Sequence, residues 1–292
     1  MRSFKDKVAV ITGAGSGIGQ ALAVELAKAG AQLAISDINL ENVAATAQQC
    51  AALGGKVKHY RLDCGNRDAI YANADEVMKD FGSVNLLINN AGVAVNATVR
   101  ELTDEDFHWL MDINFWGMVH GTRAFLPHLT ASGDGHLVNI SSIFGMVGVP
   151  KQSAYNAAKF AIRGFTEALR QELILEKAPV QVSCVHPGGI KTNIAKAARK
   201  GPSDKDKDIS INFDNFARTT PSQAANIILR GIKRNKPRIF VGMDSKVIDL
   251  LQRVMGAGYQ NIVGPVYERR MNQPAGATGF FSFLQPRTPA NK

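Results

Sequence analysis

Three side chains in the middle of the chain could together move a proton. Tyr155 and Lys159 are four residues apart, a spacing that puts both on one face of a helix. A free phenol has a pKa near ~10, and a lysine charge beside it favours the phenolate and lowers that pKa. Ser142, thirteen residues before the tyrosine, could hydrogen-bond the same oxygen. Such a tyrosine exchanges protons with alcohols or carbonyls, but the pair alone is more typical of an ordinary surface helix, so the context must decide.

A glycine-rich turn follows the first predicted strand. Residues 8–11 are an apolar run that predicts a buried strand. Thr12–Gly19 follows with the pattern T-G-x-x-x-G-x-G, and a helix is predicted after it to about residue 30. Backbone N–H groups and the helix dipole at such a turn face an anion, and the glycines let it approach. We therefore expect a phosphate-binding turn formed by Gly13, Ser16, Gly17, Ile18 and Gly19.

A carboxylate ends the second predicted strand, residues 32–36. Asp37 lies 18 residues past Gly19, where it can accept hydrogen bonds from both hydroxyls of a ribose and repel a ribose phosphate. Ile38 follows it, and no Arg or Lys stands nearby in the sequence. This arrangement favours NAD over NADP as the cofactor. The alternative is that Asp37 caps the helix that begins near Glu41.

These motifs, with several more in the same order, resemble those of the classical short-chain dehydrogenase/reductase family. The resemblance covers residues 5 to about 195, and its further motifs are Asp63, Asn89-Asn90-Ala91-Gly92, Asn114, Ser141-Ser142, Tyr155-x-x-x-Lys159, Pro187-Gly188 and Thr192. It implies that Tyr155 is the acid/base and that Lys159 binds the nicotinamide ribose and tunes Tyr155. It also implies that Ser142 orients the substrate oxygen, while Asn114 kinks its helix and holds a water of the proton relay.

The resemblance further implies the rest of the cofactor site. Asp63 would contact the adenine, and the backbone of Asn90, Ala91 and Gly92 would line the cofactor. Pro187, Gly188 and Thr192 would surround the nicotinamide, with Cys64 and Ile190 completing the expected set. Ala158, where the family often has Ser, is a departure that affects no catalytic position. Residues 62–67 with Ile70 and Tyr71 are similar to a stretch in the hydroxysteroid and retinol dehydrogenase-like branch.

Strand-like and helical segments alternate along the whole chain. The strand-like runs lie near residues 8–12, 32–36, 57–62, 85–89, 136–140, 180–185 and 239–241. This alternation predicts an α/β fold with a doubly wound, mainly parallel, seven-stranded sheet of the Rossmann-like kind. We expect one catalytic domain at residues 1–245, with a substrate lid at 193–220, and a C-terminal helix and Pro/Gly-rich tail at 246–292.

Charge and cysteine content limit which partners and which cellular compartment are expected. The net charge is +9, and residues 193–292 hold 17 basic and 7 acidic groups, so the excess lies in the last third. The pattern favours solvated surface charge and leaves peripheral membrane contact open, while the missing aromatic interleaving argues against nucleic acid. Three scattered cysteines without metal spacing indicate reduced thiols and a cytoplasmic enzyme with no metal.

The last third also carries apolar segments. Residues 245–256 have the spacing of an amphipathic helix that covers the substrate pocket or a subunit contact, and residues 279–284 form an aromatic patch. We expect a homodimer or homotetramer. An apolar substrate pocket is predicted from Val93, Val95, Phe144, Met146, Val147, Val149, Ile190, Ile194, Phe213 and Phe216.

The sequence therefore predicts an NAD-dependent oxidoreductase that interconverts a lipophilic secondary alcohol and its ketone. An NADPH-dependent carbonyl or acyl-thioester reductase is the enzymatic alternative. A non-catalytic NAD-binding scaffold is the alternative of another class, and its usual mark, loss of the tyrosine or lysine, is absent here.

Overall fold

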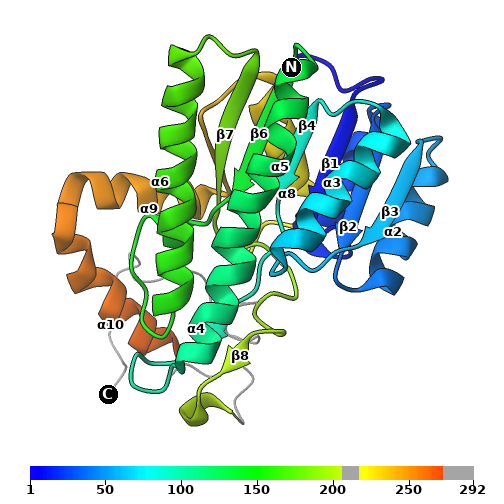
Figure 1. Ribbon diagram of the computed structural model, residues 1–292. Coiled ribbons are helices and arrows are strands. Elements are labelled where there is room, and N and C mark those ends of the chain that lie inside the picture. Colours follow the sequence, from blue (N-terminus) through cyan, green and yellow to red (C-terminus); the bar gives the residue numbers. More distant parts are fainter. Residues whose placement is uncertain (206–216, 272–292) are drawn as a thin grey trace, which may run out of the picture.

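The computed structural model describes residues 1–205 and 217–271. Seven parallel strands form the main sheet, in the spatial order β3-β2-β1-β4-β6-β7-β9 (Figure 1). Their bounds are β1 Val8–Thr12, β2 Gln32–Asp37, β3 Val57–Arg61, β4 Leu86–Asn89, β6 Gly135–Ile140, β7 Val180–Pro187 and β9 Arg238–Val241. The predicted fold class is confirmed, and each predicted strand lies within two residues of an observed one.

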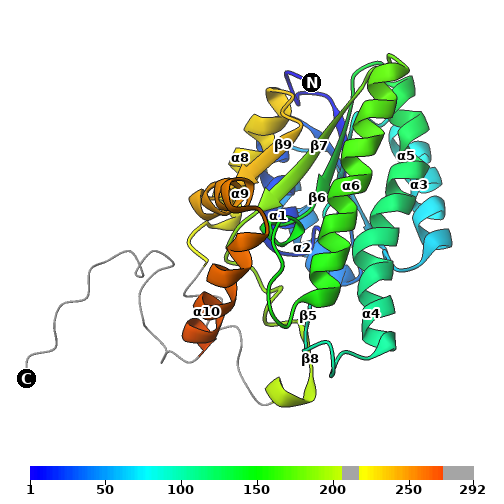
Figure 2. The same ribbon diagram turned by 90° about the vertical axis from the view of Figure 1, so that its left-hand side faces the viewer.

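Helices cover both faces of this sheet. On one face lie α1 (Gly17–Lys28), α2 (Leu40–Ala51) and α8 (Pro221–Lys233), and on the other lie α3 (Arg67–Phe81), α5 (Gly117–Ala131) and α6 (Ser153–Leu175). Figure 2 shows α8 on one side of the strands and α5 and α6 on the other.

Strand β1 illustrates why the sequences of the strands are continuous apolar runs. Successive side chains of a strand point to opposite faces, so Ala9 and Ile11 pack in the core under α1 and α8. Val8 and Val10 pack in the second core, with residues of α3, α5 and α6. Because both faces are buried, neither can be polar.

A chain of buried polar side chains links the centre of the sheet to two helices. Asn89 Nδ2 donates to Asn139 Oδ1 at 2.9 Å and to Thr122 Oγ1 of α5 at 3.1 Å. Asn139 Nδ2 donates in turn to Thr166 Oγ1 of α6 at 3.0 Å. Asn89 and Asn139 are register partners on β4 and β6. A slip of one strand would leave buried amides unpaired, so these bonds fix the register.

The chain continues past the last strand as two helices, which we call the C-terminal arm. Helix α9 spans Met243–Met255, and α10 spans Gln260–Met271 (Figure 1). Ile248 of α9 and Tyr259, between the two helices, pack with Ile143, Met146 and Val147 of the loop after β6. The predicted amphipathic helix at 245–256 corresponds to α9, whereas α10 lies in the segment that the sequence analysis assigned to a tail.

The first part of the expected lid joins a small second sheet. Strand β8 (Arg199–Lys200) pairs in parallel with β5 (Val95–Asn96), and a 3₁₀ turn follows at Pro202–Asp204. Residues 206–216, with Phe213 and Phe216, and the aromatic patch at 279–284 lie outside the described residues. Among the residues that are described, none of the helices is long and apolar enough to cross a membrane.

Candidate active site

One large cavity, of about 620 Å³, opens at the carboxyl ends of the parallel strands. Most of the residues predicted for the site line it. They are Gly13, Ser16, Gly17, Ile18, Asp37, Asp63, Cys64, Asn90, Ala91, Gly92, Ser142, Tyr155, Lys159, Pro187, Gly188, Ile190 and Thr192. The other two predicted residues, Gly19 and Asn114, are not among the residues that line it.

The glycine turn presents backbone to the cavity. Gly13 and Gly17 have φ values of +64° and +58°, in the left-handed region that favours glycine. Helix α1 begins at Gly17, and the Ser16 side chain forms no capping hydrogen bond with any described residue. The first amides of α1 therefore keep their donor capacity for an anion in the cavity.

The same turn is fastened to the loop after β4. Asn90 Nδ2 donates to the carbonyl oxygens of Thr12 and Gly13, both at 3.0 Å. Thr12 Oγ1 accepts from the backbone N–H groups of Asn90 and Ala91 at 3.0 and 3.1 Å. A Cβ at Gly19 would collide with the Gly13 oxygen and come within 2.6 Å of Asn90 Nδ2. Gly19 is thus required for this close contact and does not face the cavity.

Asp37 stands at the end of β2 beside the turn. Its Oδ2 accepts from Gly15 N at 2.9 Å, and its Oδ1 accepts from Asn39 N at 3.0 Å. The cap of α2 is Asn39, whose side chain accepts from Asn42 N, so the alternative that Asp37 caps this helix is wrong. Arg61 on β3 is the register partner of Asp37 but does not line the cavity.

Asn114 lies in a distorted helical turn. Between α4 (Asp104–Met111) and α5, residues Asp112–Trp116 form a π-helical turn, which is the predicted departure from regular helix. Asn114 Nδ2 donates to Val93 O at 2.9 Å, and its Oδ1 accepts from Val93 N at 2.7 Å. Asn114 is 1% exposed and positions the segment after Gly92.

Tyr155 and Lys159 lie on α6 and face the segment after β6. Lys159 Nζ donates to Ile140 O at 3.0 Å and lies 5.4 Å from the centre of the Tyr155 ring. Burial raises the pKa of Tyr155 to about 12, although a hydrogen bond with Ser142 lowers it in part. Burial also lowers the pKa of Lys159 to about 8.

The pKa of Tyr155 therefore moves opposite to the sequence expectation, which was a lowering by the lysine charge. The physical reason is desolvation, which penalises the charged form of both groups. Tyr155 is consequently a neutral phenol at neutral pH in this structure, ready to donate a proton.

The rest of the cavity is mostly apolar. Predicted residues that line it are Val93, Phe144, Val147, Val149, Ile190 and Ile194. Val95 and Met146 were also predicted, but they are buried in neighbouring apolar clusters and do not line it. Ile248 and Leu251, in the segment 245–256 predicted to cover the pocket or a subunit contact, also line the cavity. The sequence analysis missed Asn96, Gln152, Ile262, Val263, Val266 and Tyr267 as lining residues. The apolar spacing of Ile262, Val263 and Val266 was the available signal for α10.

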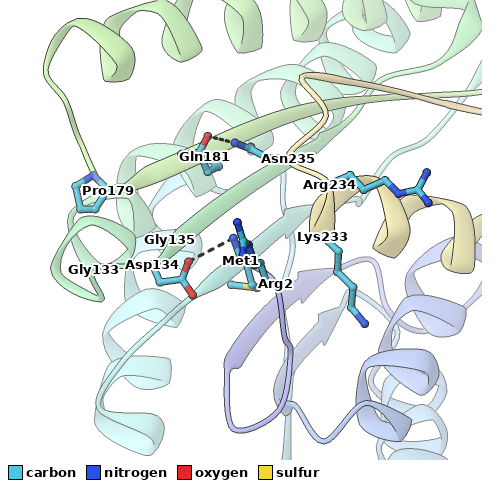
Figure 3. Close-up of a pocket in the computed structure, with 10 residues that line it drawn as sticks. All are labelled: Met1, Arg2, Gly133, Asp134, Gly135, Pro179, Gln181, Lys233, Arg234 and Asn235. Carbon is cyan, nitrogen blue, oxygen red and sulfur yellow. Dashed lines mark hydrogen bonds and ion pairs between the residues drawn. The ribbon is translucent and has the colours of Figure 1, made fainter.

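A second cavity, of about 550 Å³, lies at the amino end of β6 (Figure 3). Lys233 and Arg234 from the basic last third of the chain border it, and the amino group of Met1 pairs with Asp134 at 3.3 Å. None of the predicted site residues lines this cavity. The chemistry suggested by Tyr155 is thus confined to the large cavity.

Comparison with known proteins decides the family. The family model for short chain dehydrogenase matches residues 7–203, which include the glycine turn, Tyr155 and Lys159. The protein is a short-chain dehydrogenase/reductase. It is therefore an oxidoreductase that acts on CH–OH groups with NAD or NADP.

Two relatives and two solved structures illustrate this short-chain dehydrogenase/reductase assignment. SadH of Mycobacterium tuberculosis, named as an oxidoreductase, is 50% identical over 90% of this chain and 96% of its own. Human estradiol 17-beta-dehydrogenase 11 is 32% identical over 87% of this chain and 81% of its own.

The solved structures are similar in fold. A short-chain dehydrogenase/reductase from Burkholderia phymatum in complex with NAD superposes with a TM-score of 0.81 at 30% identity, covering 87% of this chain and 95% of that one. A metagenomic short-chain oxidoreductase in complex with NADP gives 0.67 at 26% identity, covering 82% and 98%.

The contact behind the glycine turn yields a prediction. Gly19→Ala should abolish dinucleotide binding and lower the melting temperature, because the new Cβ collides with the Gly13 carbonyl. Gly164→Ala is the matched control, since Gly164 lies in α6 with nothing within 4 Å of a Cβ. That control should raise stability by about 0.5–1 kcal/mol. Calorimetry and cofactor titration measure both effects, and normal binding by the Gly19 variant would refute this account of the turn.

Proposed function

We propose that this short-chain dehydrogenase/reductase uses NAD to interconvert a lipophilic secondary alcohol and its ketone, with Tyr155 as the acid/base. The observation that carries the proposal is one cavity lined by the glycine turn, Asp37, Ser142, Tyr155 and Lys159 together. The relative named as an estradiol dehydrogenase supports an alcohol and ketone pair. The NAD complex of the Burkholderia enzyme supports the cofactor.

The residues of the cavity fit a nicotinamide dinucleotide. At the turn, a Cβ on Gly17 would come within 3.1 Å of Thr192 Cγ2, so glycine keeps a narrow passage open between them. The free amides of α1 would hold the diphosphate, and Asp37 would accept from the ribose hydroxyls, since each carboxylate oxygen has a lone pair left. Asp63 and Cys64 would flank the adenine. Asn90, Ala91 and Gly92 would line the middle of the cofactor, and Pro187, Gly188, Ile190 and Thr192 the nicotinamide.

The proton is handled by Tyr155 with help from its neighbours. In ketone reduction the neutral Tyr155 phenol donates its proton to the substrate oxygen, while the Ser142 hydroxyl hydrogen-bonds that oxygen and fixes its position. In alcohol oxidation a Tyr155 phenolate accepts the hydroxyl proton. The bound nicotinamide supplies the hydride acceptor or donor. The Lys159 ammonium would bind the nicotinamide ribose and stabilise the phenolate, and Asn114 would hold the relay water.

The wall of the cavity supports a lipophilic substrate. Phe144, Val147, Val149 and residues of the C-terminal arm present aliphatic and aromatic surface to the reaction end. Burying matching apolar surface of a substrate is favourable by about 25 cal/mol per Å².

One observation favours NADPH as a second candidate cofactor. Arg61 is the register partner of Asp37 on the neighbouring strand, so a side-chain rotation could bring a cation to a ribose phosphate. The negative charge of Asp37 opposes this, because Asp37 itself lines the cavity and Arg61 does not. The NADP complex of the metagenomic relative shows that the fold accommodates either cofactor.

Further parts of the proposal concern organisation. We place the catalytic domain at residues 1–245, the substrate lid at 193–220 and a C-terminal extension at 246–292. We also propose a cytoplasmic homodimer or homotetramer. Trp116, just before α5, and Phe160, on α6, are exposed apolar side chains. They support a subunit contact on this side of the molecule.

Removing the Tyr155 hydroxyl tests the chemistry. Tyr155→Phe should lower kcat/KM by about 10²–10⁴-fold in both directions, while affinity for NAD stays within about twofold, because the ring still packs against Phe144. Activity is measured on a panel of secondary alcohols, steroids, retinoids and hydroxyacyl thioesters. Tyr71→Phe, outside the cavity, is the control. Substantial activity of Tyr155→Phe on the best substrate would rule out its assigned role.

The pH profile follows from the raised pKa of Tyr155. Ketone reduction needs the protonated phenol and should already be supported at pH 7. Alcohol oxidation needs the phenolate, whose fraction rises about tenfold per pH unit below the pKa, so kcat/KM for oxidation should climb from pH 6 to pH 8. Above a pH of about 8 the slope should flatten as Lys159 loses its charge. An oxidation rate that falls with rising pH would contradict this ionisation scheme.

Asp37 is expected to set the cofactor preference. The wild-type protein should bind NADH at least about tenfold more tightly than NADPH, since one like-charge contact costs over 1 kcal/mol. Asp37→Asn keeps an acceptor for the backbone and removes the charge, and Asp37→Ala removes both. Both variants should narrow the preference, whereas Arg61→Ala should leave it unchanged. Equilibrium fluorescence titrations measure this, and a wild-type preference for NADPH would defeat the argument.

A further inference from the structure

The C-terminal arm closes the cavity with apolar side chains and one hydroxyl group. Ile248 and Leu251 of α9, and Ile262, Val263 and Val266 of α10, all line the cavity. Tyr267 follows directly on α10 and also lines it. A polar group in such a wall is informative, because a buried hydroxyl costs free energy unless it finds a partner.

The Tyr267 hydroxyl has no such partner. Its oxygen is buried, and in the described part of the chain nothing forms a hydrogen bond with it. The hydroxyl groups of two buried tyrosines differ in this respect. Tyr259 Oη accepts from Gly148 N at 2.9 Å, and Tyr60 Oη donates to Asp80 at 2.8 Å. Unpaired buried polar groups are rare in native structures and call for an explanation.

A buried polar cluster also borders the cavity. Asp204, which is 1% exposed, accepts from Lys151 Nζ at 2.5 Å and from Asn96 Nδ2 at 2.8 Å. Gln152 Nε2 donates to Asn96 Oδ1 at 3.1 Å, and both Gln152 and Asn96 line the cavity. Burial and then the Asp204 charge raise the pKa of Tyr267 to about 12. Tyr267 therefore keeps its proton at neutral pH and can donate it in a hydrogen bond.

The cavity thus contains two polar places with different surroundings. At the reaction end, Tyr155 and Ser142 line the cavity with Lys159, whose Nζ lies 5.4 Å from the centre of the Tyr155 ring. Elsewhere on the wall are Tyr267, whose pKa the Asp204 charge helps to raise, and Asn96, whose side chain donates to Asp204. Much of the remaining wall, including Val93, Phe144 and Val149, is apolar. A purely hydrocarbon substrate body would leave the Tyr267 hydroxyl unpaired.

We propose that Tyr267 is a specificity-determining residue that donates a hydrogen bond to a second oxygen of the substrate. The substrate class is then a lipophilic secondary alcohol or ketone that carries a hydroxyl, carbonyl or ether oxygen away from the reacting carbon. This inference rests on the proposed function, because it assumes that Tyr155 marks the reacting end.

Matched substrates and a single atom change test the inference. Each pair of secondary alcohols differs only by a CH₂ group or an ether oxygen at the end distant from the hydroxyl, as in 4-cyclohexylcyclohexanol and 4-(oxan-4-yl)cyclohexanol, with straight-chain and steroid-sized pairs beside them. For the wild-type protein we expect the ether member to be favoured in at least one pair. In Tyr267→Phe, kcat/KM for that ether should fall about fivefold, mainly through KM, and change less than about twofold for its hydrocarbon twin.

Tyr259→Phe is the control on the same arm. It removes a hydroxyl that already bonds Gly148, so it should lower thermal stability while leaving the ratio of kcat/KM between ether and hydrocarbon unchanged. Failure of every alcohol to react, with NAD bound, would refute the proposed function itself. Turnover without a preference for any ether, or an equal loss on both members of a pair in Tyr267→Phe, would overturn the role of Tyr267 alone.

Discussion

The contact between the turn after β1 and the loop after β4 is the constraint on which the site depends. Asn90 is bonded to the carbonyls of Thr12 and Gly13, and Thr12 receives two backbone donors from the other loop. Because β1 and β4 are neighbours in the sheet, these bonds hold their carboxyl ends together at the point where the strand order reverses. The start of α1, and hence the direction of its free amides, is fixed by the same contact.

Burial is the second condition that shapes the site. Lys159 is 3% exposed, and its backbone carbonyl accepts from Ser141 Oγ at 2.8 Å, so α6 is held against the segment after β6. The same desolvation that orders these groups disfavours their charged forms. The site consequently holds a protonated phenol next to a lysine that gives up its proton more readily than a free lysine does.

The sequence predicted what depends on local pattern and failed where distant segments decide. The seven strands could be predicted because both of their faces are buried and their sequences are therefore apolar runs. Most site residues could be predicted because they directly follow those strands. Helix α10 was missed because Gly264 and Pro265 within it are weak helix formers. Packing of Val263 against the loop after β6 opposes that weakness. Two features depend on tertiary packing and could not be predicted from local residue spacing. They are the strand register that brings Arg61 opposite Asp37 and the desolvation of Tyr155.

The C-terminal arm also imposes an order in time. Synthesis proceeds from the amino terminus at about 5–20 residues per second, and the glycine turn, Asp37, Ser142, Tyr155 and Lys159 all precede residue 160. The wall residues from Ile248 to Tyr267 are made some seconds later. A nascent chain thus exposes the apolar surface of its active site before the C-terminal arm has been synthesised. Early nucleotide binding or a chaperone would shield that surface during the interval.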